Sequence, residues 1–177
     1  MRIDHTIKTP AKRMARLGIL LGIIFVLSLL ESVIVLPFMP PHFRLGLANI
    51  VIMFVLLSYG KWTAFLFVGL KAAFVLVTRG VMAGSFSLVG GMLAVLIIVL
   101  IVKIEKQQQI GLAAIGIIGA VFHNLGQFLV FMVWLAFMDM EILMFVYYVP
   151  VLIITGIIAG FLTGTLLKIL MPILNRL

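Results

Sequence analysis

The chain has 177 residues, of which 65% are hydrophobic and only 10% are charged. A soluble domain of this length needs about a quarter charged residues, so the composition excludes an ordinary soluble globular protein. The net charge of +8 does not indicate nucleic-acid binding, because the basic residues lie at the ends of apolar segments. The absence of cysteine excludes disulfides, thiolate metal sites and thiol nucleophiles.

Apolar segments long enough to cross a bilayer recur along the chain and predict membrane-spanning helices. A basic tail at residues 1–15 precedes the first segment, and no small-residue cleavage pattern follows it, so we predict an uncleaved first span. Residues 16–177 are expected to form a single transmembrane domain. The six predicted spans cover residues 16–36, 45–59, 62–78, 86–102, 110–137 and 142–170.

Three details of this division are testable. The second span is short, which predicts either that it is tilted less than the others or that neighbouring helices partly shield it. A loop containing two glycines is expected at residues 79–85, between the third and fourth spans. Pro150 predicts a kink within the sixth span.

The distribution of Lys and Arg gives the orientation. If the N-terminus is inside, ten basic residues fall on the inner side, Arg44 and Arg79 fall on the outer side, and Lys71 lies within the third span. Such an excess of positive charge is typical of the cytoplasmic side. The sequence therefore predicts an all-α, multi-pass protein of the cell membrane with six transmembrane helices and both termini in the cytoplasm.

Polar residues within the spans gather in the predicted outer half. Charged side chains in hydrocarbon are costly, so each needs a partner or water. We expect Asn49, Arg79, His123, Asn124 and Gln127 to converge on one outward-facing pocket, with Arg44 at its mouth. Because these cations, with Lys71, outnumber the carboxylate of Glu31, the pocket should suit a small molecule with an anionic part and neutral hydrogen-bonding edges.

A purely structural interpretation of the same residues stays open. Glu31 could pair with Arg44 or Arg79, and the polar residues of the fifth span could join helices by hydrogen bonds.

Small residues recur at helical spacing on three spans. Ala15, Gly18 and Gly22 share one face of the first span, and Gly116 and Ala120 share a face of the fifth. Gly156, Gly160 and Gly164 form a longer stripe on the sixth. Such faces let helices approach closely. We expect packing within the bundle for the last two spans, whereas the first-span face could equally contact a second protein.

The sequence offers little for autonomous catalysis. It has only five acidic residues, none spaced to hold Mg²⁺ jointly, and it lacks a phosphate loop, a nucleophile elbow and an H-E-x-x-H pair. The three histidines fall in a tail, a loop and a span, which is a poor metal site. We therefore expect neither an enzyme nor a resident metal or cofactor.

Five short motifs carry a family resemblance: Arg44-Leu-Gly-Leu-Ala-Asn49, Thr78-Arg79-Gly80, Gly84-Ser85-Phe86-Ser87, Gly90-Gly91, and Gly119 to Gln127 with its His123-Asn124 pair. Over about residues 16–170 the chain resembles the Gx transporter family, whose members often carry the name heptaprenyl diphosphate synthase component I. That family is similar to the substrate-binding S components of energy-coupling factor (ECF) vitamin transporters. With Ser85 added, the expected substrate-binding set is Arg44, Asn49, Arg79, Ser85, His123, Asn124 and Gln127.

The resemblance implies an S-component-like bundle with a ligand pocket on the extracellular side. It also implies that Ala15, Gly18 and Gly22 contact a transmembrane coupling subunit that works with separate ATPases. Some relatives are associated with supplying flavins to extracytosolic flavoproteins, which makes a flavin the best guess for the ligand. One alternative is a membrane subunit of a prenyl diphosphate synthase, which would be non-catalytic because the chain lacks the Asp-rich motifs that such synthases share. Another is a purely structural membrane partner of a redox complex.

Overall fold

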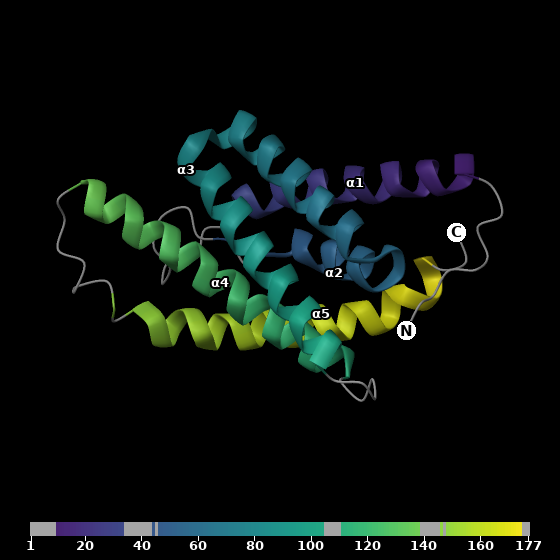
Figure 1. Cartoon of the computed structure of the whole chain (residues 1–177). Coiled ribbons are helices and arrows are strands. Elements are labelled where there is room, and N and C mark those ends of the chain that lie inside the picture. The colour runs from purple at the N-terminus through teal and green to yellow at the C-terminus, as the bar shows by residue number, and fades with distance from the viewer. Residues whose placement is uncertain are drawn as a thin grey trace.

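A computed structural model describes residues 10–33, 44, 46–104, 111–138, 146 and 148–174. Within these residues the chain forms five helices and no strand. They are α1 (Pro10–Val33), α2 (Ala48–Tyr59), α3 (Lys61–Ile104), α4 (Leu112–Phe137) and α5 (Val149–Leu174) (Figure 1). All except α2 are long and apolar enough to cross a membrane. The prediction of an all-α, multi-pass membrane protein is therefore confirmed.

The predicted third and fourth spans belong to a single element, α3, which the chain bends back at Gly80. Gly80 has φ 86° and ψ 177°, a conformation that glycine adopts without steric cost. Gly84 packs against Leu76 and Gly91 against Val68, so the two halves run antiparallel about the bend (Figure 1). The predicted loop at residues 79–85 is wrong, because one glycine suffices for the reversal and residues 81–85 are already helical.

The structure therefore has five helices where the sequence predicted six. The number differs because the third and fourth predicted spans are joined without a loop, not because an apolar segment fails to form a helix. The other predicted spans each correspond to one helix, but α1 begins at Pro10, within the predicted tail, and α5 begins at Val149, well after the predicted start at residue 142.

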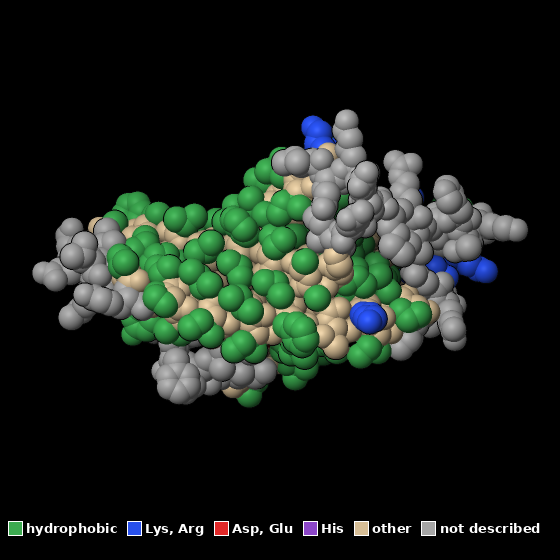
Figure 2. Space-filling model, turned by 90° about the horizontal axis from the view of Figure 1, so that it is seen from below, with side chains coloured by type: hydrophobic (Ala, Val, Ile, Leu, Met, Phe, Trp, Pro, Cys, Tyr) green, Lys and Arg blue, Asp and Glu red, His purple; other side chains and the backbone are tan. Residues whose placement is uncertain are grey.

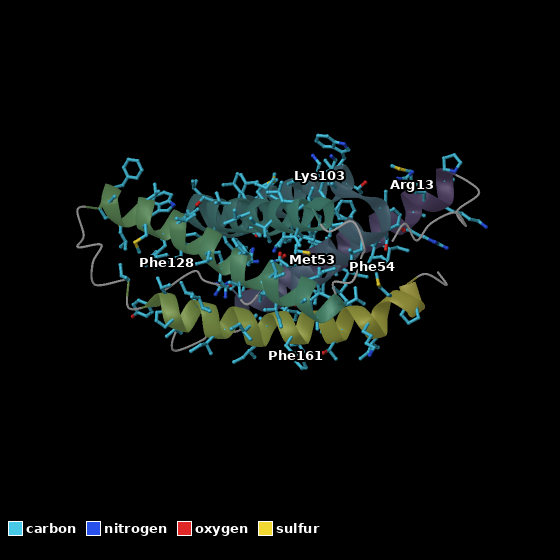
Figure 3. All side chains as sticks on the ribbon, turned by 60° about the horizontal axis from the view of Figure 1, so that its bottom comes forward. Arg13, Met53, Phe54, Lys103, Phe128 and Phe161 are labelled. Carbon is cyan, nitrogen blue, oxygen red and sulfur yellow. The ribbon has the colours of Figure 1, made fainter. Side chains whose placement is uncertain are left out.

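Helix α2 is the interior element of the bundle. Its 12 residues extend for only about 18 Å, less than the hydrocarbon thickness of a bilayer. Its residues from Ala48 to Leu56 are all buried, so neighbouring helices shield it as predicted. Met53 lies between the helices in Figure 3 and is 2% exposed. Burial on every side explains why α2 is apolar all round.

Glycines hold α4 and α5 together along their length. A Cβ atom added to Gly116 would collide with backbone atoms of Gly160, and one added to Gly164 would collide with Ala113. Gly156 likewise lies against Val121. These close backbone approaches confirm that the small residues of the fifth and sixth predicted spans serve packing within the bundle.

The small-residue face of α1 is different. Ala15, Gly18 and Gly22 are exposed, and a Cβ added to either glycine would meet no atom within 4 Å. Only Leu20, Ile24, Ser28 and Glu31 of α1 are buried. Helix α1 therefore lies against the bundle by one narrow face and leaves its small residues open.

Helix α5 begins at Val149, so Pro150 lies in its first turn. A proline is tolerated there because the first amide groups of a helix have no intrahelical partner. The predicted kink at Pro150 is therefore wrong.

The outer surface of the bundle is apolar. Figure 2, which views the molecule from the side where α5 lies, shows an almost continuous hydrophobic face with isolated basic groups. Phe161 points away from the bundle in Figure 3 and is 62% exposed. Other exposed apolar residues of α5 are Ile153, Ile154, Ile157, Ile158, Leu162 and Ile169. A surface of this kind suits contact with lipid chains rather than with water.

Several predicted segments lie outside the described residues. They are the tail as far as residue 9, most of the loop before Arg44, and the predicted loops around residues 105–110 and 139–145.

Candidate functional site

A small cavity with charged walls lies where α1, α3 and α4 meet, beside Arg44 in the segment that leads into α2. Its volume is about 20 Å³, which is room for about one water molecule. The lining residues are Glu31, Arg44, Lys71, Val75, Arg79, Ala83, Phe86, Ser87, His123 and Gln127. We use the name polar cluster for the charged residues, His123 and Gln127 of this lining together with Asn49, which does not line the cavity but binds Lys71. Its members are Glu31, Arg44, Asn49, Lys71, Arg79, His123 and Gln127.

Charge is unevenly balanced around the cavity. Arg44, Lys71 and Arg79 face it together with a single carboxylate, Glu31. Three positive charges less one negative charge leave a formal charge of +2 in an otherwise apolar bundle. Glu31 is 4% exposed and Lys71 is 3% exposed. These two buried charges are of opposite sign and offset each other, whereas Arg44 and Arg79, which carry the excess positive charge, are only partly buried.

Asn49 fixes the position of Lys71. The ammonium Nζ of Lys71 donates a hydrogen bond to Oδ1 of Asn49 at 2.9 Å, and both side chains are buried. The amide is neutral, so it satisfies a donor of Lys71 without cancelling its charge. Asn49 therefore acts on the cavity through Lys71.

Glu31 is bound to the start of α2. Its Oε1 accepts a hydrogen bond of 3.3 Å from the backbone N–H of Ala48, the first residue of α2. The first amide groups of a helix lack intrahelical partners and carry partial positive charge, which a carboxylate stabilises. Glu31 thus joins α1 to α2 at the edge of the cavity.

Gln127 holds the backbone of Arg44 with both ends of its amide. The N–H of Arg44 donates to Oε1 of Gln127 at 3.1 Å, and Nε2 of Gln127 donates to the carbonyl of Arg44 at 3.3 Å. This paired arrangement fixes the chain that leads into α2 against α4. Gln127 is therefore both a wall of the cavity and a positioning residue for Arg44.

His123 is enclosed between two glycines. A Cβ added to Gly90 would lie 2.7 Å from Nδ1 of His123, and one added to Gly46 would lie 3.2 Å from its Cδ2. Gly46 also has φ 82°, which disfavours other residues there. Nδ1 of His123 is buried without a hydrogen-bond partner among the described residues. Both glycines belong to the sequence motifs noted above, and they make room for the imidazole.

Arg79 connects α3 to α1 beside the Gly80 bend. Its terminal nitrogen donates a hydrogen bond to the backbone carbonyl of Ser28. Its Nε is buried and has no hydrogen-bond partner within the described parts of the chain. A guanidinium has five donors, so Arg79 can bind an acceptor in the cavity while it keeps its contact with α1.

Two predicted site residues point elsewhere. Ser85 donates to the carbonyl of Met82 at 2.7 Å and accepts from Nε1 of Trp134 at 3.2 Å, which joins α3 to α4. Nδ2 of Asn124 donates to the carbonyl of Leu152 at 2.9 Å, which joins α4 to α5. The described lining of the cavity contains neither residue.

The structure thus brings four of the seven predicted residues to the cavity, namely Arg44, Arg79, His123 and Gln127. Asn49 lies behind Lys71. Their part in substrate binding stays a prediction. The predicted set lacked Lys71 and Glu31, although both are charged residues within predicted spans and such residues are functional candidates by default. It also lacked Phe86 and Ser87, which the third motif contains.

No group of three or more His, Asp or Glu residues that could hold a metal ion exists among the residues the structure describes.

Comparison with known families gives one match. Residues 20–170 match the family model described as heptaprenyl diphosphate synthase component I. The match covers most of the chain, so the chain belongs to this family. No curated protein and no solved structure gives a match.

Proposed function

From membership of this family and from the charge of the polar cluster, we propose that the chain is the substrate-binding membrane subunit of a transporter of the ECF S-component type. Its substrate is a small, partly anionic, vitamin-like molecule that binds at the cavity. The observation that carries the proposal is the surplus of cations: Arg44, Lys71 and Arg79 face the cavity with one carboxylate, Glu31. An anionic ligand relieves the cost of burying that charge.

The proposed topology has six membrane passages and cytoplasmic termini. Residues 61–79 and 81–104 of α3 would extend for about 29 and 36 Å, so each half is long enough to cross a bilayer of about 30 Å. The start of α1 and the end of α5 lie at the same end of the bundle in Figure 1. The excess of Lys and Arg on that side supports a cytoplasmic position for this end of the bundle and an outside position for the cavity, near the Gly80 bend.

A flavin is the best candidate substrate, and its binding requires the bundle to widen. A vitamin-sized ligand occupies several hundred Å³, whereas the cavity holds about 20 Å³. Helix α1 is the element whose displacement costs least, because only four of its residues are buried.

The proposed partner is a transmembrane coupling subunit that works with separate ATPases, and the chain itself is not a catalyst. The open face formed by Ala15, Gly18 and Gly22 is the proposed contact, because no described residue packs against it. Small residues permit the close helix approach that such a contact needs.

The family description supports a second candidate, a non-catalytic membrane subunit of a heptaprenyl diphosphate synthase. A diphosphate is also an anion and would suit the same cations. The catalytic subunit would then be a separate chain, since this chain has only five acidic residues.

Identification of the bound molecule tests these proposals. The full chain is purified in mild detergent from its native membrane, and small molecules extracted from it are identified by mass spectrometry. We expect an anionic, flavin-like compound that is depleted at least tenfold in Arg79→Ala and retained in Arg13→Ala, where the arginine lies outside the cluster near Tyr59. A polyprenyl diphosphate in its place would favour the synthase subunit. Equal recovery of one compound from both variants would contradict binding at this cavity.

A further inference from the structure

The two fully buried charges of the cavity form a balanced pair. Lys71 is 3% exposed and Glu31 is 4% exposed, and both line the cavity. We call these two residues the buried pair. Among the interactions of the described residues they make no direct ion pair with each other. The buried part of the cavity is therefore neutral overall, but it presents a positive group and a negative group to whatever fills it.

Helix α2 holds both charges with consecutive residues. The backbone N–H of Ala48 donates to Oε1 of Glu31 at 3.3 Å, and Oδ1 of Asn49 accepts from Nζ of Lys71 at 2.9 Å. Each contact uses only part of the capacity of the charged group, because an ammonium has three donors and a carboxylate has about four acceptor positions. Lys71 can therefore donate to a ligand, and Glu31 can accept from one, while both keep their contacts with α2.

A balanced pair restricts the charge of the ligand group that contacts it. An anionic group would meet the carboxylate of Glu31 and a cationic group would meet the ammonium of Lys71, so either would be buried beside a charge of its own sign. A neutral group that accepts from Lys71 and donates to Glu31 avoids both conflicts. Because the cavity volume is only about 20 Å³, this group must carry its acceptor and its donor on adjacent atoms.

We propose that the buried pair binds the edge of a neutral cyclic imide, whose carbonyl oxygen accepts from Nζ of Lys71 and whose N–H donates to the carboxylate of Glu31. The carbonyl and the N–H are adjacent in such a ring, and both hydrogen bonds are charge-assisted. Asn49 and Ala48 are positioning residues, because they hold the two charged groups.

This assignment also orients the ligand. The imide edge lies innermost, and the anionic part of the proposed substrate lies nearer the surface, beside the partly buried Arg79. The inference rests on the proposed function, because it names the ligand group that is recognised at the same cavity.

Two kinds of ring present this edge: the ring system of a flavin and the ring of a free pyrimidine. Matched compounds separate them. The first pair is lumiflavin and lumiflavin methylated at its imide nitrogen, and the second is thymidine and thymidine methylated at its imide nitrogen. Methylation removes the N–H and leaves the carbonyls. Binding to the purified full chain in detergent is measured by isothermal titration calorimetry at neutral pH.

We expect the unmethylated member of at least one pair to bind at least about tenfold more tightly than its methylated counterpart, and a preference in one pair only identifies the ring. Glu31→Gln keeps an acceptor for Ala48 but removes the charge, and should reduce this preference at least about threefold. Lys71→Gln should weaken both members about tenfold and leave their ratio unchanged, because both keep their carbonyls. Lys168→Gln, at an exposed position on α5, should change neither quantity. If Glu31→Gln does not fold, Glu31→Asp, which withdraws the carboxylate, replaces it with the same expectation.

Equal affinity of the two members in both pairs would overturn the imide site, and so would failure of all the compounds to bind. A preference that is unchanged in the folded Glu31 variant would overturn it too, because another residue would then accept from the N–H. The proposed transport function fails separately. An imide preference without ATP-dependent uptake of the preferred compound into native membrane vesicles would retain the site and exclude transport, and uptake without an imide preference would do the reverse.

Discussion

The hydrogen bond between Lys71 and Asn49 predicts a measurable coupling between two buried side chains. Nζ and Oδ1 are 2.9 Å apart, and the side chains are 3% and 6% exposed. Asn49→Leu removes the acceptor and leaves the ammonium buried. A hydrogen bond to a charged group contributes about 1.5–3 kcal/mol, so this variant should lose about that much free energy of unfolding. For a chain of this length the loss lowers the melting temperature by about 3–12 °C.

A double-mutant cycle isolates the pair. Asn49→Leu, Lys71→Leu and the double variant are unfolded by SDS titration in mixed micelles, and Lys168→Leu serves as the exposed control, with an expected change within about 0.5 kcal/mol. The double variant should cost less than the sum of the single variants by about 1.5–3 kcal/mol, because it removes donor and acceptor together. Additivity within 0.5 kcal/mol would refute the view that Asn49 supports Lys71.

Four further outcomes are expected. Gly160→Ala should destabilise the fold by about 1–3 kcal/mol in the same SDS titration, because its new Cβ would collide with the backbone of Ile117, whereas Gly18→Ala should not; equal stability would contradict the α4–α5 packing. The double variant Gly18→Leu, Gly22→Leu should leave the melting temperature unchanged, because no described atom lies near either position. The same variant should abolish co-purification of a membrane partner, and a recovered complex would contradict contact at this face. Gln127→Leu should weaken ligand binding about tenfold in a binding titration, because both hydrogen bonds to Arg44 are lost. Asn124→Leu should reduce stability more than affinity, because the Asn124 amide binds α5. A larger loss of affinity in Asn124→Leu than in Gln127→Leu would contradict these positions. Single cysteines at Gln108 and Met140 should react with an impermeant reagent in intact cells only at position 140, and the reverse pattern would reverse the topology.

Length and hydropathy were sufficient to predict the helical, membrane-spanning class. Periodicity cannot report how two apolar segments are joined, and this explains the error at residues 79–85. Two glycines and a serine favour a loop there, whereas one glycine with positive φ closes the hairpin and the next residues continue as helix. The predicted kink at Pro150 is wrong because a proline bends a helix only when a turn of the same helix precedes it. Helix α5 begins at Val149, and the sequence pattern does not give that start.

The polar cluster could be predicted only in part. Expected depth in the membrane groups polar residues by level, and four residues grouped in this way, Arg44, Arg79, His123 and Gln127, line one cavity. Direction around the helix axis then separates neighbours: His123 faces the cavity, while Asn124, one residue later, binds the carbonyl of Leu152. A rotation of about 100° per residue has this effect, and a single sequence does not fix which face meets α5.

The single-residue reversal at Gly80 also constrains how the chain enters the bilayer. In the topology proposed above, only one residue separates the two membrane-crossing halves of α3, so we expect them to enter the bilayer together as a hairpin. The apolar second half would then offset the cost of carrying Lys71 in the first. Extra residues added after Gly80 would let the two halves enter the bilayer separately. We therefore expect such a variant to be impaired in membrane insertion rather than in ligand binding.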